Sequence, residues 1–303
     1  MGTRFQVVVE GPDRATGRRV GEVALREVER VDLLLSTWDA DTPLSRLNRT
    51  SPGTWREVEP ELEGILAETD EWARRTAGAF EARIGALVDT WDLRGAGRSP
   101  DADKLAAALA STGPAGLEFS ERGLRRRLGS AWIDSGGFGK GAGLRSAARA
   151  VTEGWPLRDH RVLMDLGGHV LGLAPPEAPW TIEVAHPDRR SESVATLSIH
   201  DRSVSTSGSS ERGSHILDPR TGRPVEPWGS VTVVDVDALA ADVLSTALYV
   251  MGPLDGLAWA EQAGIAALFL ESLDGGVAAS WTAVMERWLL KKPAALPSTR
   301  HPQ

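Results

Sequence analysis

A glycine-rich segment constrains this chain more than any other stretch: Trp132-Ile133-Asp134-Ser135-Gly136-Gly137-Phe138-Gly139-Lys140-Gly141. Residues 132–134 predict a short buried strand, and the small residues of 142–150 predict a helix directly after the glycines. Because glycine has no Cβ, backbone N–H groups at the start of that helix could close around an anion. Lys140 adds a positive charge, which suits a phosphate.

The same segment is also compatible with a plain strand-to-helix turn. Its glycine spacing matches neither GxGxxG nor GxxxxGKS/T, so neither common nucleotide-binding motif is present. Asp134 is an unexpected neighbour for a phosphate, because its carboxylate repels the anion unless a metal or a polar ligand edge engages it. On the motif alone, a phosphate site and a structural turn are equally supported.

The composition is that of an ordinary globular protein, with 303 residues, 41% apolar and 25% charged. A net charge of −8 gives no basic footprint for nucleic acid, and the absence of Cys excludes disulfides, thiolate metal ligands and a cysteine nucleophile. No apolar run approaches the roughly 20 residues that span a bilayer, and residues 1–10 lack the features of a signal peptide. We expect a cytoplasmic protein without a membrane segment, unless a leader preceded Met1.

Alternating apolar residues predict strands, and apolar residues at helical spacing predict amphipathic helices. The predicted strands are 3–10, 161–166, 180–185, 193–200, 203–207, 229–236 and 266–270, with a hairpin over 118–134. The predicted helices are 18–35, 61–77, 103–109, 142–150, 238–251 and 254–263. This irregular interleaving, without repeats or a clear linker, predicts an α+β fold with a mostly antiparallel sheet in one domain, 1–290. The Pro-rich, basic residues 291–303 predict a disordered tail.

Three oxygen-bearing residues share one face of the predicted helix 238–251. Asp242, Ser245 and Thr246 lie at i, i+3 and i+4, among apolar neighbours that indicate a largely buried helix. A buried carboxylate needs a partner, and a hard cation such as Mg²⁺ would supply one. The alternative is an Asp near a helix N-terminus beside ordinary Ser and Thr residues, and this segment taken alone favours that alternative.

Two histidines are weaker candidates. His215 precedes an Asp-Pro turn, and a lone His in a strand is more often structural than catalytic. His169 follows Gly167-Gly168 and could bind a metal, but no second ligand lies at a telling distance in the sequence.

Several motifs along the chain form an ordered series. They are Met1-Gly2-Thr3, Ser36-Thr37-Trp38, Leu44-Ser45-Arg46-Leu47-Asn48, Gly78-Ala79-Phe80-Glu81, residues 85–91, residues 134–141, Gly167-Gly168, Ser205-Thr206-Ser207-Gly208, His215-Ile216-Leu217-Asp218-Pro219-Arg220-Thr221-Gly222 and residues 241–246. Over about residues 1–270 this series resembles the FAD:protein FMN transferase family, known as ApbE. The run from His215 and the helix that carries Asp242 are its most specific parts. The resemblance implies a T-fold-like version of the α+β fold.

The resemblance also implies an activity: Mg²⁺-dependent cleavage of the FAD pyrophosphate, with transfer of FMN to a Ser or Thr hydroxyl of a target protein and release of AMP. It implies that Asp242, Thr246 and the Gly137 carbonyl ligate the metal, with Ser245 nearby. His215 would be the general base for the attacking hydroxyl. The implied flavin nucleotide contacts are Met1, Trp38, Ala79, Phe80, Glu81, Asp134, Lys140 and Ile216.

Several positions depart from the family pattern. Where the family usually has His, Asp, an aromatic residue, an acid, Asp and Tyr, this chain has Ser214, Glu81, Ala142, Arg145, His169 and Ser209. Because the metal and His215 positions are retained, FAD binding is better supported than protein flavinylation. Two alternatives therefore stand beside FMN transfer: an FAD-hydrolysing or otherwise repurposed flavin enzyme, and a flavin-binding protein without turnover.

Overall fold

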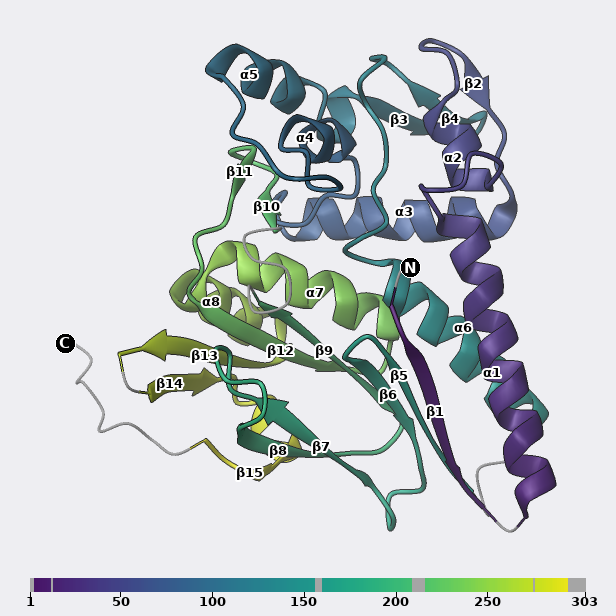
Figure 1. The fold of residues 1–303 in the computed structure, drawn as a ribbon, viewed down its shortest axis with the longest axis vertical. Coiled ribbons are helices and arrows are strands. Elements are labelled where there is room, and N and C mark those ends of the chain that lie inside the picture. Colours follow the sequence, from purple (N-terminus) through teal and green to yellow (C-terminus); the bar gives the residue numbers. More distant parts are fainter. Residues whose placement is uncertain (1–2, 12, 156–159, 209–215, 275, 294–303) are drawn as a thin grey trace.

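A seven-stranded sheet forms the centre of the protein, with the strand order β1-β5-β6-β9-β12-β13-β14 (Figure 1). The computed structural model describes residues 3–11, 13–155, 160–208, 216–274 and 276–293. All neighbouring strands in this sheet are antiparallel. The strands are β1 (Phe5–Glu10), β5 (Arg161–Leu166), β6 (His169–Leu173), β9 (Arg202–Gly208), β12 (Gly229–Asp235), β13 (Ala266–Leu273) and β14 (Gly276–Trp281). The predicted α+β fold with a mostly antiparallel sheet is confirmed.

Both faces of the central sheet are buried, and β13 shows why. Side chains alternate between the two faces of a strand, and both sets are apolar in β13. Ala267 and Phe269 pack in the cluster that contains α7 (Ala238–Met251) and part of α8 (Pro253–Ala263). Leu268 and Leu270 pack in a separate cluster on the opposite face. The sheet is therefore the middle layer of three.

A small sheet, in the order β15-β8-β7, covers that opposite face (Figure 1). Its strands are β7 (Trp180–Ala185), β8 (Ser193–Ile199) and β15 (Leu289–Lys291), and the 3-10 helix η2 (Met285–Trp288) leads into β15. Lys291 pairs with Thr196 of β8, so the first residue of the predicted tail belongs to a strand. Residues 294–303 of that tail lie outside the described residues.

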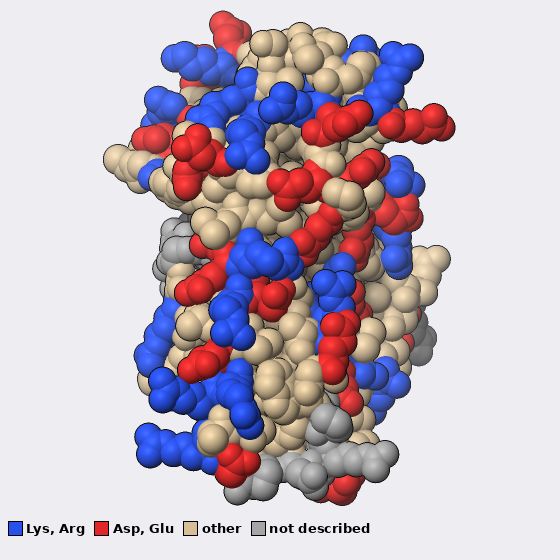
Figure 2. Space-filling view, turned by 90° about the vertical axis from the view of Figure 1, so that its right-hand side faces the viewer, with Lys and Arg blue, Asp and Glu red and all other residues tan. Residues whose placement is uncertain are grey.

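Two long helices, α1 (Arg14–Leu35) and α6 (Gly139–Gly154), run side by side next to β1 and β5 (Figure 1). Val20 and Val28 of α1 pack with Leu144 and Val151 of α6 in one apolar cluster. Figure 2 shows charges of both signs interspersed over the adjoining face of the molecule. Exposed ion pairs such as Arg18–Glu22 contribute only about 0–1 kcal/mol each, so the apolar cluster is what holds α1 in place.

The remaining elements gather at one end of the molecule, beyond α7 (Figure 1). They are α2 (Pro43–Asn48), α3 (Pro60–Arg75), α4 (Gly85–Thr90), α5 (Ala102–Ala110), η1 (Gly113–Ala115), the sheet of β2 (Trp55–Arg56), β4 (Gly123–Arg126) and β3 (Leu117–Ser120), and the ribbon of β10 (Leu217–Asp218) and β11 (Arg223–Pro224). The predicted hairpin over 118–134 is thus confined to β3 and β4. None of the helices in the part of the chain described here has the length and apolar character of a membrane-spanning segment.

The predicted strand at 132–134 is absent, and that prediction was wrong. Ile133 is buried as expected, but its N–H donates to Asn48 Oδ1 (2.8 Å) and its carbonyl accepts from Asn48 Nδ2 (2.9 Å). Asp134 N–H donates to the Ala82 carbonyl (2.9 Å). A side chain and a neighbouring loop thus satisfy this backbone, which needs no strand partner.

The helix after the glycines also begins earlier than predicted, at Gly139 instead of residue 142. Lys140 and Gly141 therefore belong to its first turn. This start places both residues against α7, since α6 and α7 pack together.

Candidate functional site

A cavity of about 920 Å³ opens between the glycine-rich segment, α7, the end of β9 and the segment that links β7 to β8. The predicted site residues that line it are Trp38, Ala79, Phe80, Glu81, Asp134, Gly137, Lys140, Ile216, Asp242 and Thr246. Their positions in the sequence span more than 200 residues, so the fold brings them together. Met1 and His215 lie outside the described residues, and their predicted roles stay predictions.

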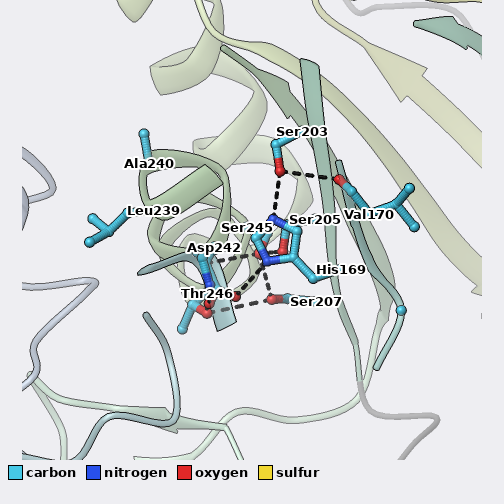
Figure 3. A network of polar contacts seen from close by, with 12 residues as sticks. His169, Val170, Ser203, Ser205, Ser207, Leu239, Ala240, Asp242, Ser245 and Thr246 are labelled. Atoms are coloured by element: carbon cyan, nitrogen blue, oxygen red, sulfur yellow. Dashed lines mark hydrogen bonds and ion pairs between the residues drawn. The ribbon is translucent and has the colours of Figure 1, made fainter. Parts of the chain in front are cut away.

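Asp242 lies one turn into α7, a helix whose N-terminus is capped by Asp237. Only 3% of Asp242 is exposed. Its Oδ2 accepts a hydrogen bond from the Gly141 N–H of α6 at 2.8 Å, and its Oδ1 lies 3.6 Å from His169 Nδ1 (Figure 3). The helix therefore holds a buried carboxylate at the cavity wall, in agreement with the buried helix that its apolar neighbours predicted.

The charge on Asp242 survives this burial. Burial opposes ionisation, but the Lys140 ammonium, His169 and the Gly141 N–H together hold the pKa of Asp242 below its ordinary value. An ionised carboxylate with unused lone pairs is the oxygen ligand that a hard cation prefers.

The hydroxyls of Ser245 and Thr246 have different surroundings. Thr246 lines the cavity, and a Cβ placed on Gly137 would lie 3.7 Å from Thr246 Oγ1, so the glycine backbone runs beside this hydroxyl. Ser245 is fully buried and does not line the cavity; its hydroxyl contacts those of Ser205 (3.1 Å) and Ser207 (2.9 Å) (Figure 3). Of the four predicted metal positions, Ser245 thus lies behind the other three.

The residues present fit a hard divalent cation with few charged protein ligands. No group of three or more His, Asp, Glu or Cys side chains gathers for a metal anywhere in the described ranges. Asp242, the Thr246 hydroxyl and the Gly137 backbone offer one carboxylate and neutral oxygens at one cavity wall. Mg²⁺ is commonly bound by one or two carboxylates together with substrate phosphates and water, which suits such a set.

The N–H groups of the glycine-rich segment are largely used within the protein, contrary to the idea that they surround an anion. Gly136 N–H donates to Asp134 Oδ1 (2.8 Å), Gly139 N–H to the Ser135 carbonyl (2.8 Å) and Gly141 N–H to Asp242. Lys140 lines the cavity, and its ammonium has no hydrogen bond or ion pair with another described residue. Lys140 is therefore the group best placed to bind a phosphate.

Asp134 has a partner that the sequence did not reveal. Arg94 Nη2 donates to Asp134 Oδ2 at 2.5 Å, which neutralises the carboxylate beside the cavity. The Arg94 guanidinium lies over the rings of both Trp38 and Trp132, 4.9 Å and 4.6 Å from their centroids. Trp38 remains 75% exposed, so this stack offers a flat aromatic surface at the cavity mouth. No motif spacing marks Arg94, because its partners come from distant segments.

At two of the positions that depart from the family pattern, Glu81 and Arg145, the side chain forms ion pairs within the protein. The Glu81 carboxylate accepts two hydrogen bonds from the Arg83 guanidinium (2.7 Å and 2.8 Å), so it lines the cavity with its charge already paired. Arg145 donates to Glu68 on α3 (2.7 Å) and to Asp237, the N-cap of α7 (3.0 Å). Arg145 therefore joins α6 to α3 and α7 and takes no place in the cavity lining.

Comparison with known proteins identifies the family and several relatives of this chain. The family model described as "ApbE family" matches residues 1–269. The FAD:protein FMN transferase of Klebsiella pneumoniae is 30% identical over 273 residues, covering 84% of this chain and 77% of that protein. The Vibrio cholerae enzyme of the same name is 29% identical over 292 residues, covering 91% and 86%.

Solved structures match the whole architecture. The flavin transferase ApbE from Vibrio cholerae superposes with a TM-score of 0.82 at 28% identity, over 95% of this chain and 96% of that one. The ApbE protein from Thermotoga maritima gives a TM-score of 0.85 at 28% identity, over 96% and 97%. This chain belongs to the ApbE family.

Proposed function

We propose that this protein transfers FMN from FAD to a Ser or Thr hydroxyl of an acceptor protein, releases AMP, and requires Mg²⁺. The observation that carries the proposal is the convergence of Asp242, Thr246, the Gly137 backbone and Lys140 on one cavity. Its volume of about 920 Å³ lies near the upper end of the range for small-molecule sites, as a dinucleotide requires. The names of the relatives support the reaction class.

Each residue has a role that follows from its surroundings. Asp242, Thr246 and the Gly137 carbonyl would hold Mg²⁺, which would supply positive charge to the pyrophosphate oxygens. Lys140 binds a phosphate oxygen through its ammonium, which has no hydrogen bond or ion pair with the other described residues. Trp38, stacked on Arg94, offers its open face to a planar ring.

Proton transfer completes the proposal. His215 takes the proton from the attacking hydroxyl, by its position in the family motif. Ile216, the residue after it, lines the cavity. We place Met1, Ala79, Phe80, Glu81 and Asp134 among the flavin nucleotide contacts, with Glu81 and Asp134 acting as paired carboxylates.

An AMP-release assay tests the proposal. The purified protein is incubated with FAD and Mg²⁺, with and without a candidate acceptor domain, and AMP and in-gel flavin fluorescence are measured. FMN transfer predicts AMP release together with covalent flavin on the acceptor. AMP without covalent flavin would indicate FAD hydrolysis, and no AMP would indicate a binding protein without turnover.

Asp242→Asn is the matched inactive variant for this assay. It keeps the shape of the side chain and an acceptor for the Gly141 N–H, but it removes the charge that would hold Mg²⁺. We expect a folded protein with strongly reduced AMP release. Asp103→Asn, at an exposed position of α5, should keep full activity. Unchanged Mg²⁺-dependent release from Asp242→Asn would place the cation elsewhere.

A further inference from the structure

His169 is a buried histidine whose two ring nitrogens face two different groups (Figure 3). It begins β6, and only 1% of its surface is exposed. Nε2 lies 2.7 Å from Ser203 Oγ on β9, and Nδ1 lies 3.6 Å from Asp242 Oδ1 on α7. Nδ1 is buried and has no hydrogen-bond partner among the described residues. An unpartnered buried nitrogen destabilises a fold, so its position beside a carboxylate needs an explanation.

The Asp242 carboxylate determines which nitrogen of the His169 ring faces it with a proton. The contacts of Ser203 allow either form of the ring: the hydroxyl can donate to Nε2 (2.7 Å), or it can donate to the Val170 carbonyl oxygen (3.2 Å) and accept from Nε2–H. Without a proton, Nδ1 would direct its lone pair at a carboxylate oxygen, which is repulsive. The Nδ1–H therefore directs its positive end toward Asp242 Oδ1.

We propose that His169 is a positioning residue that sets the orientation of the Asp242 carboxylate for the divalent cation. Oδ2 is held from α6 by the Gly141 N–H (2.8 Å), and Oδ1 is attracted from β6 by the His169 Nδ1–H. Two donors on opposite elements restrict the rotation of the carboxylate about its last bond. His169 is absent from the cavity lining, so it acts through Asp242 and does not touch the substrate. This inference rests on the proposed function, because the cation is part of that proposal.

Two substitutions test the contacts of the two ring nitrogens of His169 one at a time. In His169→Asn the side-chain amide occupies the place of Nδ1, so the donor toward Asp242 is kept and the contact to Ser203 is lost. In His169→Gln the amide reaches the place of Nε2, so the contact to Ser203 is kept and the donor toward Asp242 is lost. The two variants remove similar volume from the same buried position, and each is the control for the other.

Mn²⁺ serves as the probe, and the free ion is counted by electron paramagnetic resonance during titration of the whole protein. Residues that orient a metal ligand typically change metal affinity by about 10–100-fold when replaced. We expect a loss of that size in His169→Gln and an affinity within a few-fold of wild type in His169→Asn. The unfolding temperature without metal, recorded for both variants, reports the effect on packing.

Three results would overturn the inference. The first is wild-type affinity in both variants, and the second is an equal loss in both, because packing alone explains equal losses. The third is a wild-type protein that binds no Mn²⁺. If the His169 variants do not fold, the ¹⁵N NMR spectrum of the wild-type imidazole keeps the inference falsifiable, and a proton on Nδ1 is expected. An Nδ1 without a proton would also overturn the inference.

The Mn²⁺ titration and the AMP-release assay together show whether the inference or the proposed function fails. If wild type binds Mn²⁺ and His169→Gln loses it, but wild type releases no AMP from FAD, the inference stands and the proposed function fails. If wild type releases AMP and both His169 variants bind Mn²⁺ normally, the proposed function stands and the inference fails.

Discussion

The backbone nitrogen of Gly141 donates to Asp242 Oδ2 at 2.8 Å, joining the first turn of α6 to the carboxylate on α7. No side chain fits between these helices at this point. A Cβ on Gly141 would lie 2.4 Å from the Ala238 carbonyl oxygen and 2.7 Å from Leu239 Cα. These are backbone atoms of α7, so they cannot move aside unless the helix moves. The close approach therefore explains the glycine and the placement of Asp242 together.

Gly141→Ala should destabilise the protein, because the added methyl group forces α6 and α7 apart. Overpacking of this kind typically costs about 1–3 kcal/mol in the free energy of unfolding. Urea titration measures it, and AMP release should fall as well because the Gly141 N–H moves away from Asp242. Gly154→Ala, at the other end of α6, is the control. Apart from its chain neighbours and the backbone of its own helix, no atom of the described residues lies within 4 Å of a Cβ placed there, so the substitution should be neutral or stabilising. An equal loss in the free energy of unfolding in Gly141→Ala and Gly154→Ala would contradict this explanation.

Lys140→Met should weaken FAD binding by roughly 10- to 100-fold, since hydrogen bonds to charged groups contribute about 1.5–3 kcal/mol. Riboflavin lacks phosphate, so its affinity should be unchanged by the substitution and lower than that of FAD in wild type. Calorimetry in the presence of Mg²⁺ measures both ligands. Lys104→Met removes an exposed lysine of α5 and should change neither affinity. An equal loss of FAD and riboflavin affinity in Lys140→Met would exclude a phosphate contact.

Arg94→Met should lower FAD affinity, by roughly 10-fold, because it leaves the Asp134 carboxylate without its ion pair beside the cavity and removes the cation that lies over Trp38 and Trp132. Arg94→Lys keeps the charge but loses the planar stacking surface, so its effect should be intermediate. Quenching of flavin fluorescence measures the affinity. Arg127→Met, which breaks an exposed pair with Glu118, is the control. Wild-type FAD affinity in Arg94→Met would show that Arg94 and the aromatic rings beside it do not contribute to the binding site.

His215→Ala should lower the rate of AMP release by about 10²–10⁴-fold at saturating FAD, with FAD binding nearly intact, if His215 is the general base. Wild-type activity should rise with pH through about 6.5, the ordinary pKa of histidine. Single-turnover measurements isolate the chemical step. His200→Ala, whose ring lies against Trp288, removes a histidine outside the cavity lining and is the control. A rate within a few-fold of wild type would end the case for His215.

Asp235→Asn should stabilise the protein at neutral pH. Burial raises the pKa of Asp235 above its ordinary value, so folding favours the protonated acid and its ionisation opposes folding. The destabilisation by Asp235 is absent below the unfolded-state pKa of about 3.9 and is complete once the pH exceeds the raised folded-state pKa. Asn retains an acceptor for the Asp237 N–H. Urea titrations of both proteins should converge near pH 3; a difference that does not depend on pH would contradict this origin.

The periodic spacing of apolar residues in the sequence predicted helices and strands such as α7 and β13. The face shared by Asp242 and Thr246 follows from helical spacing, and β13 has the alternation of a strand. The prediction at 132–134 failed because Asn48, far away in sequence, satisfies the backbone of Ile133. No local pattern contains that information.

The candidate site likewise contains residues that the sequence marked and residues that only the fold brings together. Its phosphate and metal candidates had structural alternatives in the sequence and were singled out by the resemblance to a family, whereas Arg94 meets Asp134 across 40 residues and only through the fold. Glu81 is paired by Arg83, two residues away, yet the pairing depends on the backbone path and not on spacing. His169 was a weak metal candidate in the sequence, and its position behind Asp242 became visible only with β6 and α7 in place.

Because α7 lies between the central sheet and the neighbouring helices, its position determines how long the site stays intact. All its residues except Thr246 and Met251 are buried, so this helix belongs to the part of the protein that opens last. Asp242 and Thr246 therefore share the lifetime of the native state itself. A site on a surface loop could come apart while the rest stays folded, but here losing the arrangement of these two residues means losing the protein.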